Sequence, residues 1–268
     1  MKVDTVMSKP PITVDKDQLI SHALDLMEKN EISQLLVTDE DRLVGLLTEK
    51  SIADRLGSSR LDSLQASSIH ISAAMVSDFE TIDPKADIVH AAEEMLETGC
   101  SALPVVENDK LKGIVTMTDM IKLCVEVQDL FVGQIMKKDV FTVAPQSRVI
   151  HARRLMIDHG LVALPVVERD KLVGMVTERT IAYAMGAFRE IVPEKHQDAR
   201  IKHLLVVDIM RKNPPSIHPD VEVGGAAKLM LEERAKSLPI LDYESRIVGI
   251  LSPQEFVSLV SRNLTKLD

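Results

Sequence analysis

The chain has 268 residues, a formal net charge of −9 at pH 7 and a sequence pI of about 5.4. This acidic balance argues against a general nucleic-acid-binding protein, whose surface is usually basic, although net charge does not exclude a local basic patch. Hydrophobic residues make up 45% of the chain, whereas aromatic residues make up only 3% and Trp is absent. The core must therefore be built from Val, Ile, Leu, Met and Ala.

Cysteine content and hydropathy indicate a reducing, aqueous compartment. The chain has two cysteines, Cys100 and Cys124, and no C-x-x-C spacing. Two thiols cannot form a disulfide framework, and the lack of such a framework is typical of proteins in reducing compartments. The first residues contain no apolar run of the signal-peptide kind, and no stretch approaches the ~18 apolar residues of a membrane span. We therefore expect a soluble, cytoplasmic protein without a membrane partner.

A set of landmark residues recurs four times along the chain. Each copy contains, at nearly constant spacing, a methionine, a hydroxyl residue, an alanine, a glycine and a second hydroxyl residue. The four sets are Met7, Thr13, Ala23, Gly45 and Thr48; Met75, Thr81, Ala91, Gly113 and Thr116; Met136, Thr142, Ala152, Gly174 and Thr177; and Met210, Ser216, Ala226, Gly249 and Ser252. Gly249 comes one position late because the fourth copy has one extra residue before it. A register kept through four copies indicates one module used four times.

The second copy shows the expected structure of the module most clearly. Its first extended segment stops at Pro84, since a proline disfavours helix in the residue before it, and its first helix ends at the C-cap Gly99. The predicted order is a strand over 79–82, an amphipathic helix over 86–98, strands over 102–106 and 111–115, and a second helix from Thr116 to about residue 125. The module is therefore β-α-β-β-α, an α/β (α+β) fold.

The other copies follow the same order. Their predicted elements are helix 19–29 with strands 34–37 and 43–47; helix 149–158 with strands 163–167 and 172–176; and helix 221–232 with strands 238–241 and 247–251. The expected repeats are 1–60, 69–127, 130–187 and 204–265, with 188–203 as a linker. Modules this small bury too little apolar surface to be stable alone, so we expect them to pair.

Two short runs recur around the central strands of the repeats. They are Leu103-Pro104-Val105-Val106 with Gly113-Ile114-Val115-Thr116-Met117-Thr118-Asp119; Leu164-Pro165-Val166-Val167 with Gly174-Met175-Val176-Thr177; and Leu238-Pro239-Ile240-Leu241 with Gly249-Ile250-Leu251-Ser252. The first repeat departs from this pattern, with Leu36 in place of the proline, but it keeps Gly45-Leu46-Leu47-Thr48. These runs resemble the signature of CBS domains, named after cystathionine β-synthase.

The resemblance covers nearly the whole chain. It implies that the repeats pair side by side through their sheets, as Bateman modules, with clefts between them. Two such pairs in one chain resemble the γ subunit of AMP-activated kinase, in which four repeats form a disc. The resemblance also implies a ligand, because the clefts of many members bind adenine nucleotides or S-adenosylmethionine.

In each repeat, the hydroxyl residue at the start of the second helix is followed three positions later by another polar residue. The pairs are Thr48 and Ser51, Thr116 and Asp119, Thr177 and Thr180, and Ser252 and Glu255. One interpretation is a helix-capping box, which suits Ser252 and Glu255 because Pro253 stands at the favoured first helical position. For Asp119 we expect a poor reciprocal bond, since its side chain is short. The resemblance implies instead that Asp119 accepts both hydroxyls of a ribose, while Thr116 serves phosphate or caps the helix.

The resemblance gives an expected set of nucleotide contacts, of which the apolar members could equally be ordinary core residues. In the second repeat they are Thr81, Ile82, Ser101, Ala102, Pro104, Thr116 and Asp119. In the fourth repeat they are Ser216, Ile217, Lys236, Ser237, Pro239, Ser252 and Glu255. Lys236 stands where the kinase γ subunit places basic groups near phosphate, although it could also be a solvated lysine. The first and third repeats lack the carboxylate and should bind less well, through Thr13, Thr48, Ser51, Thr142, Thr177 and Thr180.

These observations favour a regulatory protein rather than an enzyme. No catalytic triad order, Walker loop or paired carboxylates occur, so we expect no catalytic cofactor, and His22, His90 and His151 lack the partners of a metal site. We expect AMP, ADP, ATP or S-adenosylmethionine as the ligand and a protein partner or a second copy of the chain as the receiver. Two alternatives remain open. One is a scaffold with empty clefts, and the other is RNA or DNA binding through the basic segment from Arg189 to His203.

Overall fold

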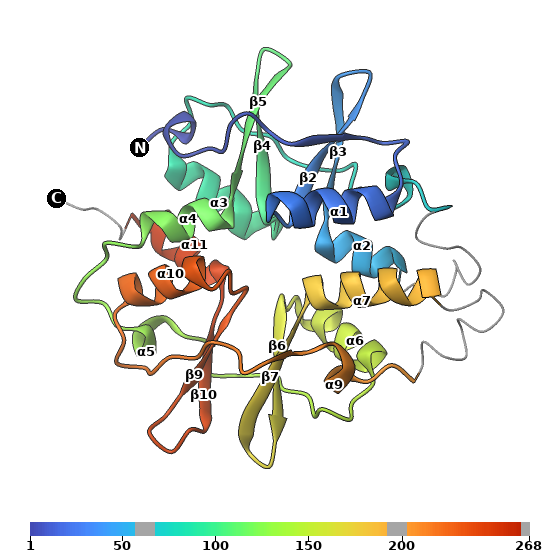
Figure 1. The fold of residues 1–268 in the computed structure, drawn as a ribbon. Helices are drawn as coiled ribbons and strands as arrows, with labels where there is room; N and C mark the ends of the chain where they lie inside the picture. Colours follow the sequence, from blue (N-terminus) through green and yellow to red (C-terminus); the bar gives the residue numbers. More distant parts are fainter. Residues whose placement is uncertain (57–67, 192–202, 264–268) are drawn as a thin grey trace.

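The four repeats form a disc in the computed structural model, which describes residues 1–56, 68–191 and 203–263. The hairpins of repeats 1 and 2 extend from one edge, those of repeats 3 and 4 extend from the opposite edge, and most of the helices lie between them (Figure 1). The arrangement confirms the expected α/β repeats and the disc.

Every repeat contains the predicted α-β-β-α order, but among the described residues the first strand of the β-α-β-β-α module forms only in repeat 1. Repeat 1 contains β1 (Thr13–Asp15), α1 (Ile20–Asn30), β2 (Gln34–Asp39), β3 (Arg42–Thr48) and α2 (Glu49–Leu56); repeat 2 contains α3 (Ile88–Thr98), β4 (Ala102–Glu107), β5 (Lys110–Thr116) and α4 (Met117–Leu123). Repeat 3 contains α6 (Val149–His159), β6 (Ala163–Glu168), β7 (Lys171–Thr177) and α7 (Glu178–Ile191); repeat 4 contains α10 (Val223–Glu232), β9 (Leu238–Leu241), β10 (Ile247–Leu251) and α11 (Pro253–Ser261). Apart from the strand predicted over 79–82, the predicted bounds differ from these by at most two residues.

The predicted strand over 79–82 is wrong. Only Ile82 pairs with the hairpin, in a single parallel bridge to Val105, whereas the matching segment of repeat 1 forms the three-residue strand β1. The N–H of Lys16 continues that ladder by donating to the carbonyl of Thr38 at 3.0 Å. Repeat 2 has Pro84 at the position of Lys16, and a proline has no N–H to donate.

Short segments at the start of each repeat are exchanged between neighbours. η1 (Val3–Thr5) of repeat 1 lies on repeat 2, and η4 (Ile71–Ala73) of repeat 2 lies on repeat 1: the N–H of Val3 donates to the carbonyl of Ala86, and that of Ile71 donates to the carbonyl of Gln18. Repeats 3 and 4 make the same exchange through α5 (Val132–Ile135), α9 (Val206–Ile209) and β8 (Arg211–Lys212). Repeats 1 and 2 therefore form one pair, and repeats 3 and 4 form the other.

The landmark methionines and glycines meet at these exchanged segments. Each methionine side chain lies over the glycine of the other repeat in its pair, so closely that a Cβ on the glycine would collide with it. The contacts are Met7 on Gly113, Met75 on Gly45, Met136 on Gly249 and Met210 on Gly174. The Met and Gly residues that recur in the sequence thus form a contact between the two repeats of each pair.

The two pairs are joined through their helices, which form two separate cores. α2 packs against α7, joining repeats 1 and 3, whereas α11 packs against α3 and α4, joining repeats 2 and 4 (Figure 1). The landmark alanines, which are fully buried, lie in these cores: Ala23, Ala91, Ala152 and Ala226. Around the disc, the order of the repeats is therefore 1, 2, 4, 3.

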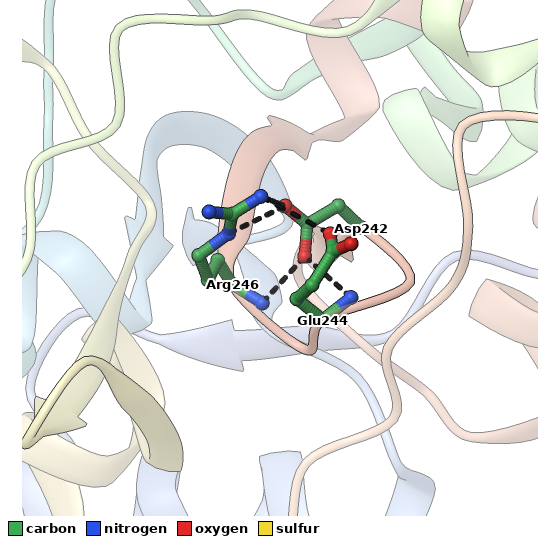
Figure 2. A network of polar contacts seen from close by, with 3 residues as sticks. All are labelled: Asp242, Glu244 and Arg246. Carbon is green, nitrogen blue, oxygen red and sulfur yellow. Dashed lines mark hydrogen bonds and ion pairs between the residues drawn. The ribbon is translucent and has the colours of Figure 1, made fainter.

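The extra residue of the fourth copy lies in the loop between β9 and β10. The other three hairpins turn through two residues with positive φ, such as Asn108 and Asp109. Here a longer loop is held by Asp242, whose Oδ1 accepts from the N–H groups of Glu244 (3.0 Å) and Arg246 (2.8 Å), while its Oδ2 accepts from Nε of Arg246 (2.8 Å) (Figure 2). The strands therefore keep their register despite the insertion.

Gly113→Ala is expected to lower the free energy of unfolding by about 1–3 kcal/mol, a usual cost of overpacking. The new Cβ would lie 2.7 Å from the carbonyl oxygen of Ser8 and 2.9 Å from Sδ of Met7, and the backbone oxygen cannot move unless the exchanged segment moves. Denaturant unfolding measures the change.

Gly225→Ala in α10 is the control. Its Cβ would meet only a methyl group of Val221, at 3.3 Å, so the substitution is expected to be neutral or to stabilise by up to about 1 kcal/mol through helix propensity. If Gly113→Ala were as stable as the wild type, the methionine–glycine contact would not constrain the fold.

Candidate ligand site

Asp119 closes the start of α4 in repeat 2. One of its oxygens, Oδ2, accepts from the backbone N–H and from the hydroxyl of Thr116, each at 2.9 Å, and the Thr116 side chain in turn completes a capping box. The expectation that a short Asp makes this reciprocal bond poorly is therefore wrong. The extended backbone of Thr116 (φ −131°, ψ 165°) brings its N–H within reach of the short side chain.

The second oxygen of Asp119 is occupied as well. Nζ of Lys122, one turn further along α4, lies 2.9 Å from Oδ1. The Asp119 side chain is 2% exposed, whereas that of Lys122 is 57% exposed. The predicted ribose ligand is thus a buried carboxylate whose three donors are all local, and one donor stands in solvent.

The structure brings most of the other predicted residues of repeat 2 to the same place. The N–H of Ile82 donates to the carbonyl of Pro104 at 3.0 Å, and the N–H of Met117 donates to the carbonyl of Ser101 at 3.0 Å. Ala102 and Pro104 are buried, whereas Thr81 is exposed. Ser101 also donates through its hydroxyl to Oε1 of Gln34 in repeat 1 at 3.0 Å, so this site lies where the two repeats of a pair meet.

Repeat 4 repeats the arrangement with a longer carboxylate. Oε2 of Glu255 accepts from the N–H and from the hydroxyl of Ser252, each at 2.7 Å, which confirms the expected capping box. Its other oxygen lies 3.3 Å from Nζ of Lys137, which comes from the exchanged segment of repeat 3. The N–H of Ile217 donates to the carbonyl of Pro239, as in repeat 2.

The remaining predicted residues of repeat 4 lie beside this arrangement. Ser216 and Lys236 are partly buried and Ser237 is buried, just before β9.

Repeats 1 and 3 have hydroxyl groups at the corresponding position. The N–H of Thr48 donates to Oγ of Ser51 at 3.0 Å, and the N–H of Thr177 donates to the hydroxyl of Thr180 at 2.9 Å. Thr13 and Thr142 are exposed. These starts of helices are capped, but they place no carboxylate where Asp119 and Glu255 stand.

Two glutamates that the sequence reasoning missed, one buried and one partly buried, lie at the interface of repeats 1 and 3. Glu49 and Glu178 are the first residues of α2 and α7, and Oε1 of Glu49 lies 3.1 Å from Nη1 of Arg179. Both follow the landmark threonine directly, and each is followed by a basic residue. The Thr-Glu-Lys/Arg pattern is shared by repeats 1 and 3 and absent from repeats 2 and 4, and it could have singled out these two glutamates.

Burial raises the pKa of both carboxyl groups. The pKa of Glu178 is raised to about 7, because desolvation outweighs the nearby charges of Lys50 and Lys236, while Glu49 and Asp54 add to the rise. Desolvation also raises the pKa of Glu49, against the charges of Lys236 and Arg179. Lys236 of repeat 4 therefore acts on both glutamates, which belong to repeats 1 and 3.

A small cavity lies beside Glu178, between repeats 1 and 3. Its volume is about 20 Å³, and its polar lining includes Lys50, Asp54, Arg153 and Glu178. None of the predicted nucleotide contacts lines it.

The histidines and the basic segment singled out in the sequence add no described residue to the candidate ligand site. His22, His90 and His151 are exposed on helices, and the described part of the chain holds no group of three or more His, Cys, Asp or Glu side chains placed to bind a metal. Within the same residues, no helix has the length and apolar character needed to cross a bilayer. Of the basic segment from Arg189 to His203, the side chains from 189 to 202 lie outside the described residues.

Glu178→Gln is expected to change how stability depends on pH. A carboxyl whose pKa is higher in the folded chain (about 7) than in the unfolded chain (4.5) binds more protons when folded, so its contribution to stability falls as pH rises through this window. Glu178→Gln has no carboxyl at this position, so its stability does not fall for this reason as pH rises. Allowing for solvent screening, we expect it to gain about 1–2 kcal/mol over the wild type at pH 8 relative to pH 4.5.

Denaturant unfolding at several pH values measures this difference, with Glu97→Gln, a change at an exposed glutamate of α3, as the control. Parallel stability curves for wild type and Glu178→Gln would show that Glu178 does not titrate in this window.

Comparison with known proteins agrees with this architecture. MJ1225 of Methanocaldococcus jannaschii is 24% identical over 92% of this chain and 94% of its own length. Its crystal structure, described as that of a proposed archaeal homologue of the γ subunit of AMP-activated kinase, overlies 96% of this chain and 99% of that chain with a TM-score of 0.84 at 23% identity. That likeness establishes the fold.

Other relatives are longer than this chain. MJ1404 of the same organism is 28% identical over 97% of this chain, which spans 62% of MJ1404. An inosine-5′-monophosphate dehydrogenase of Korarchaeum cryptofilum is 33% identical over 44% of this chain, and the match spans 22% of the dehydrogenase. Two further structures each overlie half of this chain: CBSX2 in complex with AMP, with a TM-score of 0.42, and the CBS domain pair of MJ0100 in complex with 5′-methylthioadenosine and S-adenosylmethionine, with a TM-score of 0.41.

The model of the CBS domain matches four segments, residues 3–58, 69–126, 132–187 and 206–262. Because these segments make up most of the chain, the protein belongs to the CBS domain family.

Proposed function

We propose that this protein is a regulatory sensor that binds an adenine nucleotide or a related adenosyl ligand beside Asp119 in repeat 2, and more weakly beside Glu255 in repeat 4. The observation that supports it best is the position of Asp119. This carboxylate is held at a helix start by Thr116, which pairs with Ala102 on β4, and the preceding Ser101 contacts the neighbouring repeat. The family resemblance implies that a carboxylate at this position binds the ribose of a nucleotide.

Ligand binding would proceed by exchange of donors. Ribose hydroxyls would replace the ammonium group of Lys122, whose exposed side chain can turn into solvent, while Thr116 continues to hold the other oxygen of Asp119. A buried carboxylate needs donors at all times, so the exchange must be direct. The N–H groups at the start of α4 favour a negatively charged group nearby, which suits a phosphate.

The signal would pass through the helices. α4 packs against α10 and α11 of repeat 4, so a ligand that shifts the start of α4 acts on the core shared by repeats 2 and 4. A coupling of about 1–3 kcal/mol between ligand and partner is enough for regulation. The partner would be another protein or a second copy of this chain.

A scaffold with unoccupied sites is the rival function, because all oxygens of Asp119 already have donors. Thermal unfolding separates the two functions. A ligand at 100 times its Kd adds about 2.7 kcal/mol to the stability of a sensor and adds nothing to that of a scaffold.

Asp119→Ala is expected to lower the affinity of the tightest site for AMP about tenfold, because the ribose hydroxyls would be left without an acceptor, at a cost of about 1–3 kcal/mol. Calorimetric titration with AMP, ATP and S-adenosylmethionine measures it. Asp109→Asn, at the tip of the adjacent hairpin, is the control and should leave affinity unchanged.

Lys122→Ala gives a second, opposite test. If Lys122 competes with the ribose, its removal should leave affinity equal or higher. Unchanged affinity in Asp119→Ala would exclude this carboxylate as a ligand, and the absence of heat with all three compounds would favour the scaffold.

A further inference from the structure

Contacts between helices assign each first helix of a repeat to a face of the disc. At the interface of repeats 2 and 4, α11 packs against α3 and α4, and α4 packs against α10, so α4 and α11 lie between α3 and α10. At the interface of repeats 1 and 3, α2 packs against α7. Arg153 of α6 donates to the carbonyl of Asp54 on α2 at 3.0 Å. Tyr183 of α7 donates to the carbonyl of Leu24 on α1 at 3.0 Å, so α2 and α7 lie between α6 and α1.

An ion pair across the centre of the disc shows which of these outer helices share a face. Glu31, at the end of α1, pairs with Arg234, just beyond α10, although repeats 1 and 4 lie diagonally in the disc. α1 and α10 therefore lie on one face, and α3 and α6 lie on the other (Figure 1). Gly99 and Gly160 end α3 and α6 at the register positions of Glu31 and Arg234, so these two helices also point toward the centre.

The face of α3 and α6 has exposed apolar side chains at matching positions. Leu96 on α3 is 42% exposed and Ile157 on α6 is 45% exposed. A hollow of about 480 Å³ lies along α6, and its described lining is Ile150, His151, Arg153, Arg154, Ile157 and Asp158. On the other face the matching residues are Glu28, which is exposed, and Leu231. Single exposed apolar residues are ordinary, so the charges around this pair must decide whether the face binds a partner.

The two helices of this face carry opposite charge. α3 contains three glutamates and no lysine or arginine, whereas α6 contains two arginines and one aspartate. At matching register positions, repeat 2 has Asp87 and Glu93 where repeat 3 has Arg148 and Arg154, and all four are exposed. In a chain with a net charge of −9, a second copy is the partner that offers both an acidic and a basic helix in this arrangement.

We propose that the face of α3 and α6 is a homodimer interface, in which α3 of each copy lies along α6 of the other. Two twofold axes in the plane of this face would stack two discs. One places α3 against α6 twice, in a self-complementary contact, and the other places α3 against α3 and α6 against α6. The second arrangement brings like charges together, so charge selects the first.

The selected axis pairs the helices in register. Because α3 and α6 both point toward the centre of the disc, α3 runs parallel to α6 of the second copy, and Leu96 lies against Ile157 of that copy. The facing charged pairs are Asp87 with Arg148, Glu93 with Arg154, and Glu97 with Asp158. The first two pairs attract and only the third repels. The intrahelical pairs of Glu93 and Arg154, to His90 at 3.9 Å and to Asp158 at 3.4 Å, are exposed and therefore weak competitors.

Sedimentation equilibrium of the full chain at increasing micromolar concentrations tests the proposal. The wild type should approach twice its mass of 29.7 kDa. Glu93→Arg and Arg154→Glu should each raise the Kd of the dimer about tenfold, because each substitution places two like charges opposite one another. The double variant Glu93→Arg/Arg154→Glu exchanges the charges and should recover most of the wild-type affinity.

The matched control is Asp25→Arg. Asp25 is exposed on α1 at the register position of Glu93, but it lies on the other face of the disc. The substitution should leave the Kd of the dimer unchanged. Thermal unfolding of each variant, followed by circular dichroism, verifies that the fold is intact.

A wild type that stays monomeric at every concentration would overturn the proposal. A dimer that Asp25→Arg weakens as much as Glu93→Arg does would also overturn it, because the contact would then lie elsewhere. Failure of the double variant to recover would exclude the pairing of α3 with α6. No nucleotide enters these measurements, so their outcome is independent of the function proposed above.

Discussion

The exchange of N-terminal segments between neighbouring repeats is the constraint on which the rest of the structure depends. The segment that begins one repeat supplies the methionine that covers the glycine of the other, and it also supplies backbone partners for the first helix there. The carbonyl of Met1 accepts from the N–H of Ile88, and the carbonyl of Ala86 accepts from the N–H of Val3. A repeat without its neighbour would lack both, so the unit that folds is the pair.

The position of one acidic residue distinguishes the two halves of the disc. In repeats 1 and 3 the acid is the first residue of the second helix, whereas in repeats 2 and 4 it is the third. Helices of repeats 1 and 3 pack together, so Glu49 is buried and Glu178 is partly buried where the two repeats meet. The acids of repeats 2 and 4 turn back on the start of their own helices. Both interfaces contain an apolar core, and the interface of repeats 1 and 3 also contains charge that costs desolvation.

Sequence periodicity predicted the helices and strands because the same pattern of residues occurs separately in each of the four repeats. It could not predict which repeats share a core, since all four first helices bury an alanine in the same register and any two could pack together. Pro84 was used to end a strand, yet its missing N–H prevents that strand from forming. Asp119 was expected to cap its helix poorly, but its capping bond depends on backbone angles that no residue pattern specifies. Whether it binds ribose remains a prediction.

The closed state of Asp119 also limits what a ribose can contribute. Its hydroxyls would replace an ammonium group that already satisfies the same oxygen, so the exchange gains little free energy: the number of hydrogen bonds to the carboxylate is unchanged, and a charged donor is lost. Affinity must then come mainly from burying the base and from contacts to phosphate. Basic groups that bind the phosphate, for which Lys236 is the candidate, would therefore decide how strongly the phosphorylated forms of one nucleoside are distinguished from the nucleoside alone.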